Sequence, residues 1–177
     1  LSDDTISVIF KNLIKETNFA NVSRFIEKLQ GKLIARRSVS MKVVIVGGVA
    51  GGASAAARIR RLDETAEIIV FERTGYVSYA NCGLPYYIGG IITQPSALTL
   101  QTPQSFWARF RINIKVHHEV TAIDPVSKTV TVHDLDTDNI FIESYDKLIL
   151  SPGAKAIIPS IPGTDLDKIF SLRTVED

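Results

Sequence analysis

After residue 41, short apolar runs alternate with glycine-rich and polar segments. The runs Lys42–Val46 and Glu67–Glu72 are rich in β-branched residues and largely apolar on both faces, which is typical of buried parallel strands. The alanine-rich segment Ala53–Leu62 between them favours a helix that ends in several arginines. A strand, a helix and a second strand within about 30 residues predict the building block of a doubly wound α/β sheet.

The later apolar patterns add further elements. A helix is predicted over Pro103–Phe110, a strand over Ile112–Val116 and another buried strand over Lys147–Leu150. Three alternating runs separated by turn residues predict a β-meander with strands Glu119–Asp124, Thr129–Val132 and Ile140–Glu143. We therefore expect an α/β fold in which a Rossmann-like parallel sheet carries helices and a β-meander.

Residues 1–40 follow a different pattern from the rest of the chain. Apolar residues recur at helical spacing within Ile9–Ile14 and Val22–Leu33, and Arg36–Ser40 resembles a linker. Seven basic and four acidic residues place the positive excess of the chain in this segment. The sequence predicts a helical leader here, followed by one domain over residues 41–177. A solvated leader and a membrane-surface or partner-binding helix both remain open.

Composition favours a globular chain and excludes several classes of protein. The 177 residues carry a net charge of +1 and are 45% hydrophobic, which suits one domain with a small appendage and points to no nucleic-acid partner. The longest charge-free apolar run, Val43–Ala57, falls short of the roughly 20 residues that span a bilayer. Since no secretory signal is found either, we expect a cytoplasmic protein without a membrane span. The single cysteine excludes an internal disulfide and any CxxC pair.

The turn between the first strand and the helix is suited to binding an anion. It reads Gly47, Gly48, Val49, Ala50, Gly51 and Gly52. Backbone N–H groups of such a turn and of the helix N-terminus bind a pyrophosphate, and Glu72 stands where an acid accepts hydrogen bonds from a ribose. Val49 departs from the GxGxxG register, and the motif alone does not separate FAD from NAD(P). The alternative is a tight turn that holds no ligand.

The single cysteine, Cys82, lies in a segment of turn formers. Pro85 is well placed to open a short helix, and a cysteine just before a helix N-terminus gains thiolate character. Cysteine is more often a small buried hydrophobic residue. The residues alone therefore leave a redox-active thiol and an inert thiol both open.

The stretch around Cys82 is part of a resemblance that covers residues 41–177. The matching segments are Val46–Gly52, Arg58–Asp63, Phe71–Arg73, Ser78–Gly89 and Ser144–Ala154. Through them the chain resembles the N-terminal part of the coenzyme A-disulfide reductases, a single-cysteine branch of the FAD-dependent pyridine nucleotide-disulfide oxidoreductases. Val49 is shared with these reductases. The active-site motif of the branch usually reads Ser-Phe-x-x-Cys, and here Tyr79 replaces the phenylalanine and adds a hydroxyl.

The resemblance implies a role for particular residues, with Cys82 as the redox-active group. FAD would be held by Gly47, Gly48, Val49, Ala50, Gly51, Gly52, Glu72, Arg73, Val120, Ser151, Pro152 and Gly153. Coenzyme A would be held by Ser54, Arg58, Arg61, Ser78 and Asn81. The two arginines share a helical face and suit phosphates, although such arginines are also common on solvated helix surfaces. A further family cation does not align, because Phe110 takes its place, with Arg109 and Arg111 beside it.

For the intact protein, the resemblance implies reduction of coenzyme A disulfide or persulfide by NAD(P)H through FAD and a mixed disulfide between Cys82 and coenzyme A. The family's NAD(P)H and dimerisation domains are expected outside this chain, in a homodimer. The chain then corresponds to the first, incomplete part of the FAD-binding domain, which we expect to be inactive alone. Two alternatives remain. One is an NADH oxidase or peroxidase in which Cys82 cycles through a sulfenic acid; the other is a non-catalytic flavin-binding fragment.

Other notable residues suggest no ligand. His117 and His118 have no Cys or carboxylate partner at metal-ligand spacing apart from Glu119, and the acidic turn Asp134–Asp138 lacks the glycine and the final glutamate of a calcium loop. No metal site is therefore predicted. Trp107 and Tyr86 are expected to be packing residues.

Overall fold

The computed structural model describes residues 40–177, so the helices expected within the leader lie outside the described residues. In chain order the elements are β1 (Lys42–Val46), α3 (Ala50–Leu62), β2 (Glu67–Phe71), the 3₁₀ turn η1 (Asn81–Gly83), α4 (Leu84–Ile88), the 3₁₀ turn η2 (Pro95–Ala97), α5 (Pro103–Phe110), β3 (Asn113–Lys115), β4 (His118–Asp124), β5 (Thr129–Asp134), β6 (Asn139–Ser144) and β7 (Lys147–Leu150). Within the described part of the chain, no helix is long and apolar enough to cross a membrane.

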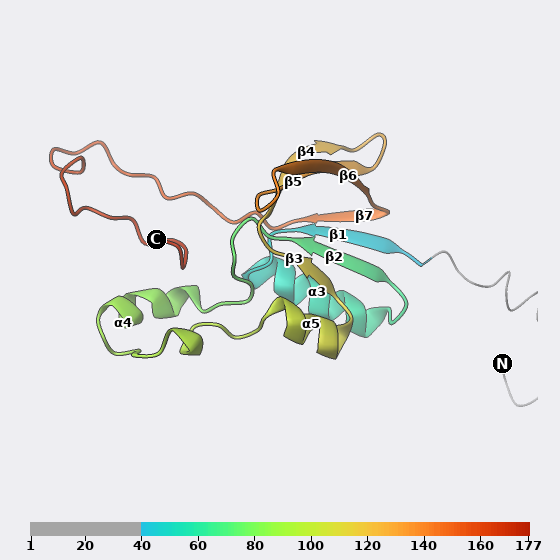
Figure 1. Cartoon of the computed structure of the whole chain (residues 1–177), viewed down its shortest axis with the longest axis horizontal. Helices are drawn as coiled ribbons and strands as arrows, with labels where there is room; N and C mark the ends of the chain where they lie inside the picture. Colours follow the sequence, from blue (N-terminus) through green and yellow to red (C-terminus); the bar gives the residue numbers. More distant parts are fainter. Residues whose placement is uncertain (1–39) are drawn as a thin grey trace, which may run out of the picture. The chain divides into compact units, whose positions relative to one another are not determined.

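Two sheets form the body of this domain. The strands β3, β2, β1 and β7 lie in that order and pair in parallel. The strands β4, β5 and β6 form an antiparallel meander. Figure 1 shows α3 and α5 against one face of the parallel sheet and the meander against the other. This arrangement confirms the α/β fold with a Rossmann-like sheet and a β-meander.

Both faces of the central strands are buried, as their apolar pattern predicts. Val43 and Ile45 of β1 point into the core beneath α3 and α5. Val44, between them in the sequence, points to the other face, where it packs in a cluster with Val130 and Val132 of β5. Because alternate residues of a strand face opposite sides, one short run fills two cores.

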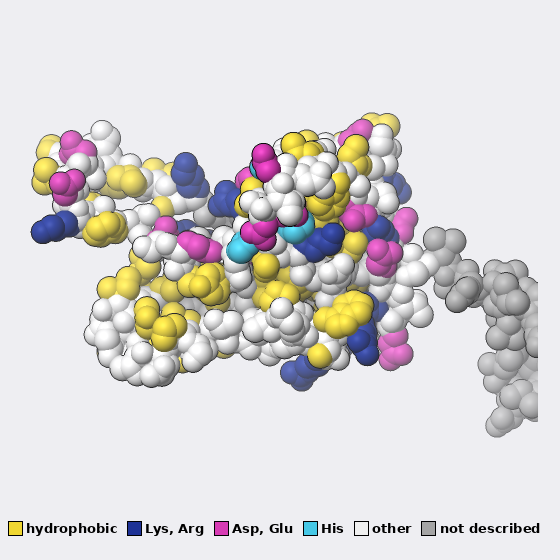
Figure 2. All heavy atoms as spheres, viewed as in Figure 1, with side chains coloured by type: hydrophobic (Ala, Val, Ile, Leu, Met, Phe, Trp, Pro, Cys, Tyr) yellow, Lys and Arg dark blue, Asp and Glu magenta, His cyan; other side chains and the backbone are white. Residues whose placement is uncertain are grey.

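The structure corrects several expectations. The strand β7 was predicted to be buried, but none of its residues is fully buried and Leu150 is 56% exposed, because β7 lies at the edge of the parallel sheet. The helix α3 begins at Ala50, three residues earlier than predicted, because the Ala53 N–H already bonds to the Val49 carbonyl. Trp107 and Tyr86 are 52% and 56% exposed, so the expectation that they are packing residues is wrong. The short α5 buries only Phe106, and α4 buries only Leu84. Apolar side chains consequently show on the surface around α4 (Figure 2).

Lys42 links three strands through one ammonium group. Its Nζ lies 2.6 Å from Glu143 Oε1 of β6 and 3.3 Å from Glu67 Oε1 of β2. The hydrogen bond to Glu143 is the main cause that raises the pKa of Lys42 above 10.5. The side chains of Lys42 and Glu143 are 23% and 18% exposed, whereas that of Glu67 is 53% exposed.

We expect Glu143→Gln to lower the free energy of unfolding by about 1 kcal/mol at neutral pH, because a partly buried ammonium loses a charged acceptor. Since Lys42 has the higher pKa when folded, its contribution is complete below the unfolded pKa of about 10.4 and is lost as pH rises through the folded value. Thermal unfolding from neutral pH to above pH 10 tests both points. Glu67→Gln is the control, and an equal effect of the two variants would contradict the prediction.

Candidate active site

The glycine-rich turn leads directly from β1 into the open end of α3. Gly47 has φ of 93°, and its N–H bonds to the Phe71 carbonyl at 2.8 Å. A Cβ at this position would lie 2.1 Å from the Ser151 carbonyl oxygen, so only glycine allows the end of β7 to approach. Because the first helical bond is that of Ala53, the preceding N–H groups of the turn have no acceptor within the helix. These groups make the turn a site for an anion.

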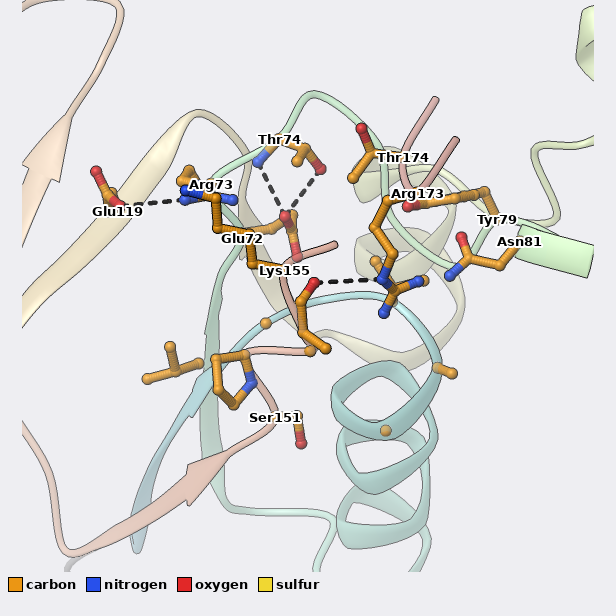
Figure 3. Close-up of a pocket in the computed structure, with 18 of the residues that line it drawn as sticks. Glu72, Arg73, Thr74, Tyr79, Asn81, Glu119, Ser151, Lys155, Arg173 and Thr174 are labelled. Atoms are coloured by element: carbon orange, nitrogen blue, oxygen red, sulfur yellow. Dashed lines mark hydrogen bonds and ion pairs between the residues drawn. The ribbon is translucent and has the colours of Figure 1, made fainter. Parts of the chain in front are cut away.

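A cavity of about 710 Å³ opens over this turn, within the size range of cofactor sites. Its wall includes most of the residues predicted to hold the cofactor: Gly47, Val49, Ala50, Gly51, Glu72, Arg73, Val120, Ser151, Pro152 and Gly153. Figure 3 shows Arg73 and Glu119 toward one end of this cavity and Tyr79 and Asn81 toward the other. The topology therefore gathers residues from four distant parts of the sequence around one space.

Gly48 and Gly52 were also predicted to hold the cofactor, but they do not line the cavity. A Cβ on Gly52 would lie 1.7 Å from the Gly47 carbonyl oxygen. A Cβ on Gly48 would lie 3.1 Å from Val77 Cγ1 and 3.2 Å from Glu72 Cβ. The structure thus gives these two glycines a packing role: they allow neighbouring backbone and side-chain atoms to lie against the turn.

Glu72 is buried in the cavity wall and held by the chain itself. Its Oε2 accepts from the Gly48 N–H at 2.6 Å, and its Oε1 accepts from the N–H and hydroxyl of Thr74 at 2.9 and 2.8 Å. A carboxylate offers about four acceptor positions, so these bonds leave capacity for a ribose hydroxyl. Arg73 lies 3.6 Å from Glu119, and because both side chains are exposed the pair contributes little stability.

The segment that carries Cys82 is attached to the glycine turn. The Ser78 N–H bonds to the Gly48 carbonyl at 3.1 Å. Cys82 is a free, exposed cysteine in η1, and α4 follows directly with Pro85 in its first turn, as predicted. Its neighbour Asn81 lines the cavity, whereas Cys82 lies outside the lining. The thiol therefore stands in solvent beside the cavity.

The residues predicted to hold coenzyme A fall into two groups. Ser54, Arg58 and Arg61 are spaced one turn apart on an exposed face of α3, and Ser78 and Asn81 belong to the Cys82 segment. In the described part of the chain, no hydrogen bond or ion pair joins the first group to the second. The structure leaves both groups accessible without bringing them into contact.

The neighbouring arginines have other partners. Arg60 donates to the carbonyls of Asp63, Glu64, Ala66, Phe110 and Arg111, so it ties α3 to the end of α5. Arg109 lies over the Phe110 ring at 5.1 Å and Arg111 over the Trp107 ring at 5.5 Å. Both arginines therefore lie against aromatic rings of α5.

Several cavity residues were missed by the sequence analysis. They include Thr74, Tyr79, His118, Glu119, Arg173 and Thr174. Tyr79 carried a signal, since it is a substitution inside the cysteine motif. Arg173 carried none: it comes from the irregular tail, where its Nε donates to the Ala154 carbonyl at 3.2 Å. Among residues 40–177, no group of three or more His, Cys, Asp or Glu side chains could hold a metal ion.

Comparisons with known proteins identify the family of the chain. Residues 41–177 match the family described as pyridine nucleotide-disulphide oxidoreductase. The chain is 48% identical to the coenzyme A disulfide reductase of Staphylococcus aureus (strain JH9) over 136 residues, which are 77% of this chain and 30% of that protein. The chain thus spans about a third of the length of this relative.

Two solved structures extend the comparison. Reduced Bacillus anthracis CoADR-RHD is 54% identical, with a TM-score of 0.74 over 79% of this chain and 25% of its own. The water-forming NADH oxidase from Lactobacillus brevis is 40% identical, with a TM-score of 0.66 over 72% of this chain and 28% of its own. Fold, glycine turn, cysteine segment and family match agree: the chain belongs to the pyridine nucleotide-disulphide oxidoreductase family.

Proposed function

We propose that the protein to which this chain belongs uses NAD(P)H to reduce coenzyme A disulfide, or a coenzyme A persulfide, with FAD in the cavity and Cys82 as the redox-active residue. The observation that carries the proposal is the exposed Cys82 on a segment bonded to the glycine turn of the cavity. The 48% identity to a coenzyme A disulfide reductase supports the choice of substrate. A reducing, cytoplasmic setting and a homodimer fit the same proposal.

The cavity suits a dinucleotide in shape and chemistry. The backbone at Gly51 and the open end of α3 would receive a pyrophosphate. Glu72, Arg73 and Val120 would hold the adenosine end, with Ser151 to Gly153 alongside. FAD bound there supplies two-electron transfer between a nicotinamide and a disulfide.

Cys82 would act on the substrate by thiol–disulfide exchange. Its thiolate attacks one sulfur of coenzyme A disulfide, the substrate S–S bond breaks, and one coenzyme A leaves as a thiolate. A mixed disulfide between Cys82 and the other coenzyme A remains. Two electrons and the accompanying protons return that bond to two thiols. Because Cys82 is exposed, a substrate too large for a buried site can reach its sulfur.

Arg58 and Arg61 are proposed to bind the phosphates of coenzyme A. We expect Arg58→Gln and Arg61→Gln each to raise KM for coenzyme A disulfide about tenfold with little change in kcat, because each removes a charge-assisted bond distant from the reacting sulfur. Steady-state kinetics with a small, phosphate-free disulfide is the control. An equal loss with both substrates would indicate a structural effect and contradict phosphate binding.

The proposed activity is tested by following NAD(P)H oxidation by the full-length gene product. Coenzyme A disulfide should accelerate the oxidation under anaerobic conditions, with one NAD(P)H consumed for each pair of thiols formed. Oxidation that requires oxygen or peroxide and ignores the disulfide would overturn the proposal. A protein that holds FAD but oxidises no NAD(P)H would be a non-catalytic flavin-binding module.

An NADH oxidase is the second candidate, favoured by the 40% identity to the Lactobacillus brevis enzyme. In that case Cys82 would cycle between thiolate and sulfenic acid, a gain of one oxygen. Arg58 and Arg61 weigh against it, because oxygen and peroxide offer no phosphate to bind. The oxidation state of Cys82 after purification without reductant separates the candidates.

A further inference from the structure

Tyr79 is fixed rigidly beside the cavity. Tyr79 is 7% exposed and belongs to a hydrophobic cluster with Leu84 and Leu98, against which Val49 and Val175 pack. The backbone is held as well, because Tyr79 pairs with Thr99 in an isolated antiparallel bridge. A ring held on this many sides keeps one orientation.

Tyr79 lines the cavity, and its hydroxyl has no hydrogen-bond partner among residues 40–177. A buried tyrosine usually finds a partner for its hydroxyl. Burial is the main cause that raises the pKa of this phenol above 10, and Glu176 and Glu72 add to it. The group is therefore a neutral donor at physiological pH.

A second unpaired group lies on the same side. The Oδ1 atom of Asn81 is buried and has no hydrogen-bond partner in the described part of the chain. Figure 3 shows Asn81 and Tyr79 together at the end of the cavity opposite Arg73 and Glu119. Because solvent does not reach Asn81 Oδ1, the Tyr79 hydroxyl is the unpaired group at this end that a ligand in the cavity can reach.

We propose that Tyr79 positions FAD by donating a hydrogen bond from its hydroxyl. The inference rests on the proposed function, which puts the adenosine end of FAD near Arg73 and the redox end near the Cys82 segment. FAD offers oxygen and nitrogen acceptors on its ring and phosphates, and donors on its ribityl chain. A phenylalanine would fill the same cluster without the donor, so Tyr79 distinguishes this chain from the usual motif.

Tyr79→Phe in the full-length gene product tests the inference, with Tyr76→Phe as the matched control. The rings of Tyr76 and Tyr79 meet edge to face, with their centroids 6.5 Å apart, but Tyr76 is 39% exposed and does not line the cavity. We expect Tyr79→Phe to bind FAD about five- to tenfold more weakly in titrations of the apoprotein, and Tyr76→Phe to bind it as the wild type does.

The flavin reduction potential, measured on the same proteins, locates the bond. A shifted potential in Tyr79→Phe places it on the isoalloxazine ring, whereas weaker binding at unchanged potential places it on the ribityl or phosphate part. If the wild-type protein binds FAD and the Tyr79→Phe variant binds it with equal affinity and an equal potential, this inference is overturned but the proposed function is not. Wild-type protein that binds no FAD overturns the proposed function and this inference together.

Discussion

Replacing Cys82 by serine should abolish reduction of coenzyme A disulfide by the full-length gene product, with a loss of about 10³-fold or more in kcat. A serine hydroxyl cannot form the mixed disulfide, and residues 1–177 hold no other cysteine to replace it. FAD content should remain at the wild-type level, because Cys82 is exposed and does not line the cavity. Loss of turnover with retained flavin would separate the chemistry from the cofactor site.

Intact-mass spectrometry of protein purified without reductant tests the same point independently. An adduct of about 765 Da that dithiothreitol removes, and that Cys82→Ser lacks, would be the mixed disulfide with coenzyme A. A free thiol or a gain of one to three oxygens would favour the oxidase or peroxidase instead. Wild-type turnover by Cys82→Ser would contradict a redox role for this residue.

The strands and the glycine turn could be predicted because each depends on a local pattern. The structure confirms the ranges Lys42–Val46 and Lys147–Leu150, but only the first is buried, because the second lies at the edge of the sheet. The start of α3 was misplaced because the turn and the first helical turn share Gly51 and Gly52, and glycine disfavours a helix. Tertiary packing against Gly47 overrides that preference.

The rest of the site depends on contacts that no local pattern contains. Arg173 enters the cavity wall through a bond to Ala154, nineteen residues away, within an irregular tail. Trp107 and Tyr86 are large aromatic residues of a type common in cores, yet the short helices that carry them bury only one side chain each. The exposure of these aromatic rings follows from where the chain places α4 and α5, which the sequence of either helix does not reveal.

Replacing a glycine of the turn is expected to have the second large effect, in this case on stability. Gly52→Ala should destabilise the domain by about 3 kcal/mol or more, because the new Cβ would lie 1.7 Å from the Gly47 carbonyl oxygen. That oxygen belongs to the turn backbone, so relief requires moving the turn itself. Alanine gains about 1 kcal/mol of helix propensity over glycine, which is too small to offset the clash.

Gly51→Ala is the matched control, because it adds the same methyl group one residue earlier in the same helical turn. Its Cβ would lie 3.1 Å from Ser151 Oγ, a side-chain atom that can rotate away. We expect this variant to unfold within about 1 kcal/mol of the wild type in thermal and urea melts, and Gly52→Ala to lose soluble, flavin-loaded protein. Since propensity is equal at the two sites, a difference between the variants isolates packing against Gly47. Equal stability of the two proteins would show that the turn relaxes freely, and Gly52 would then have no packing role.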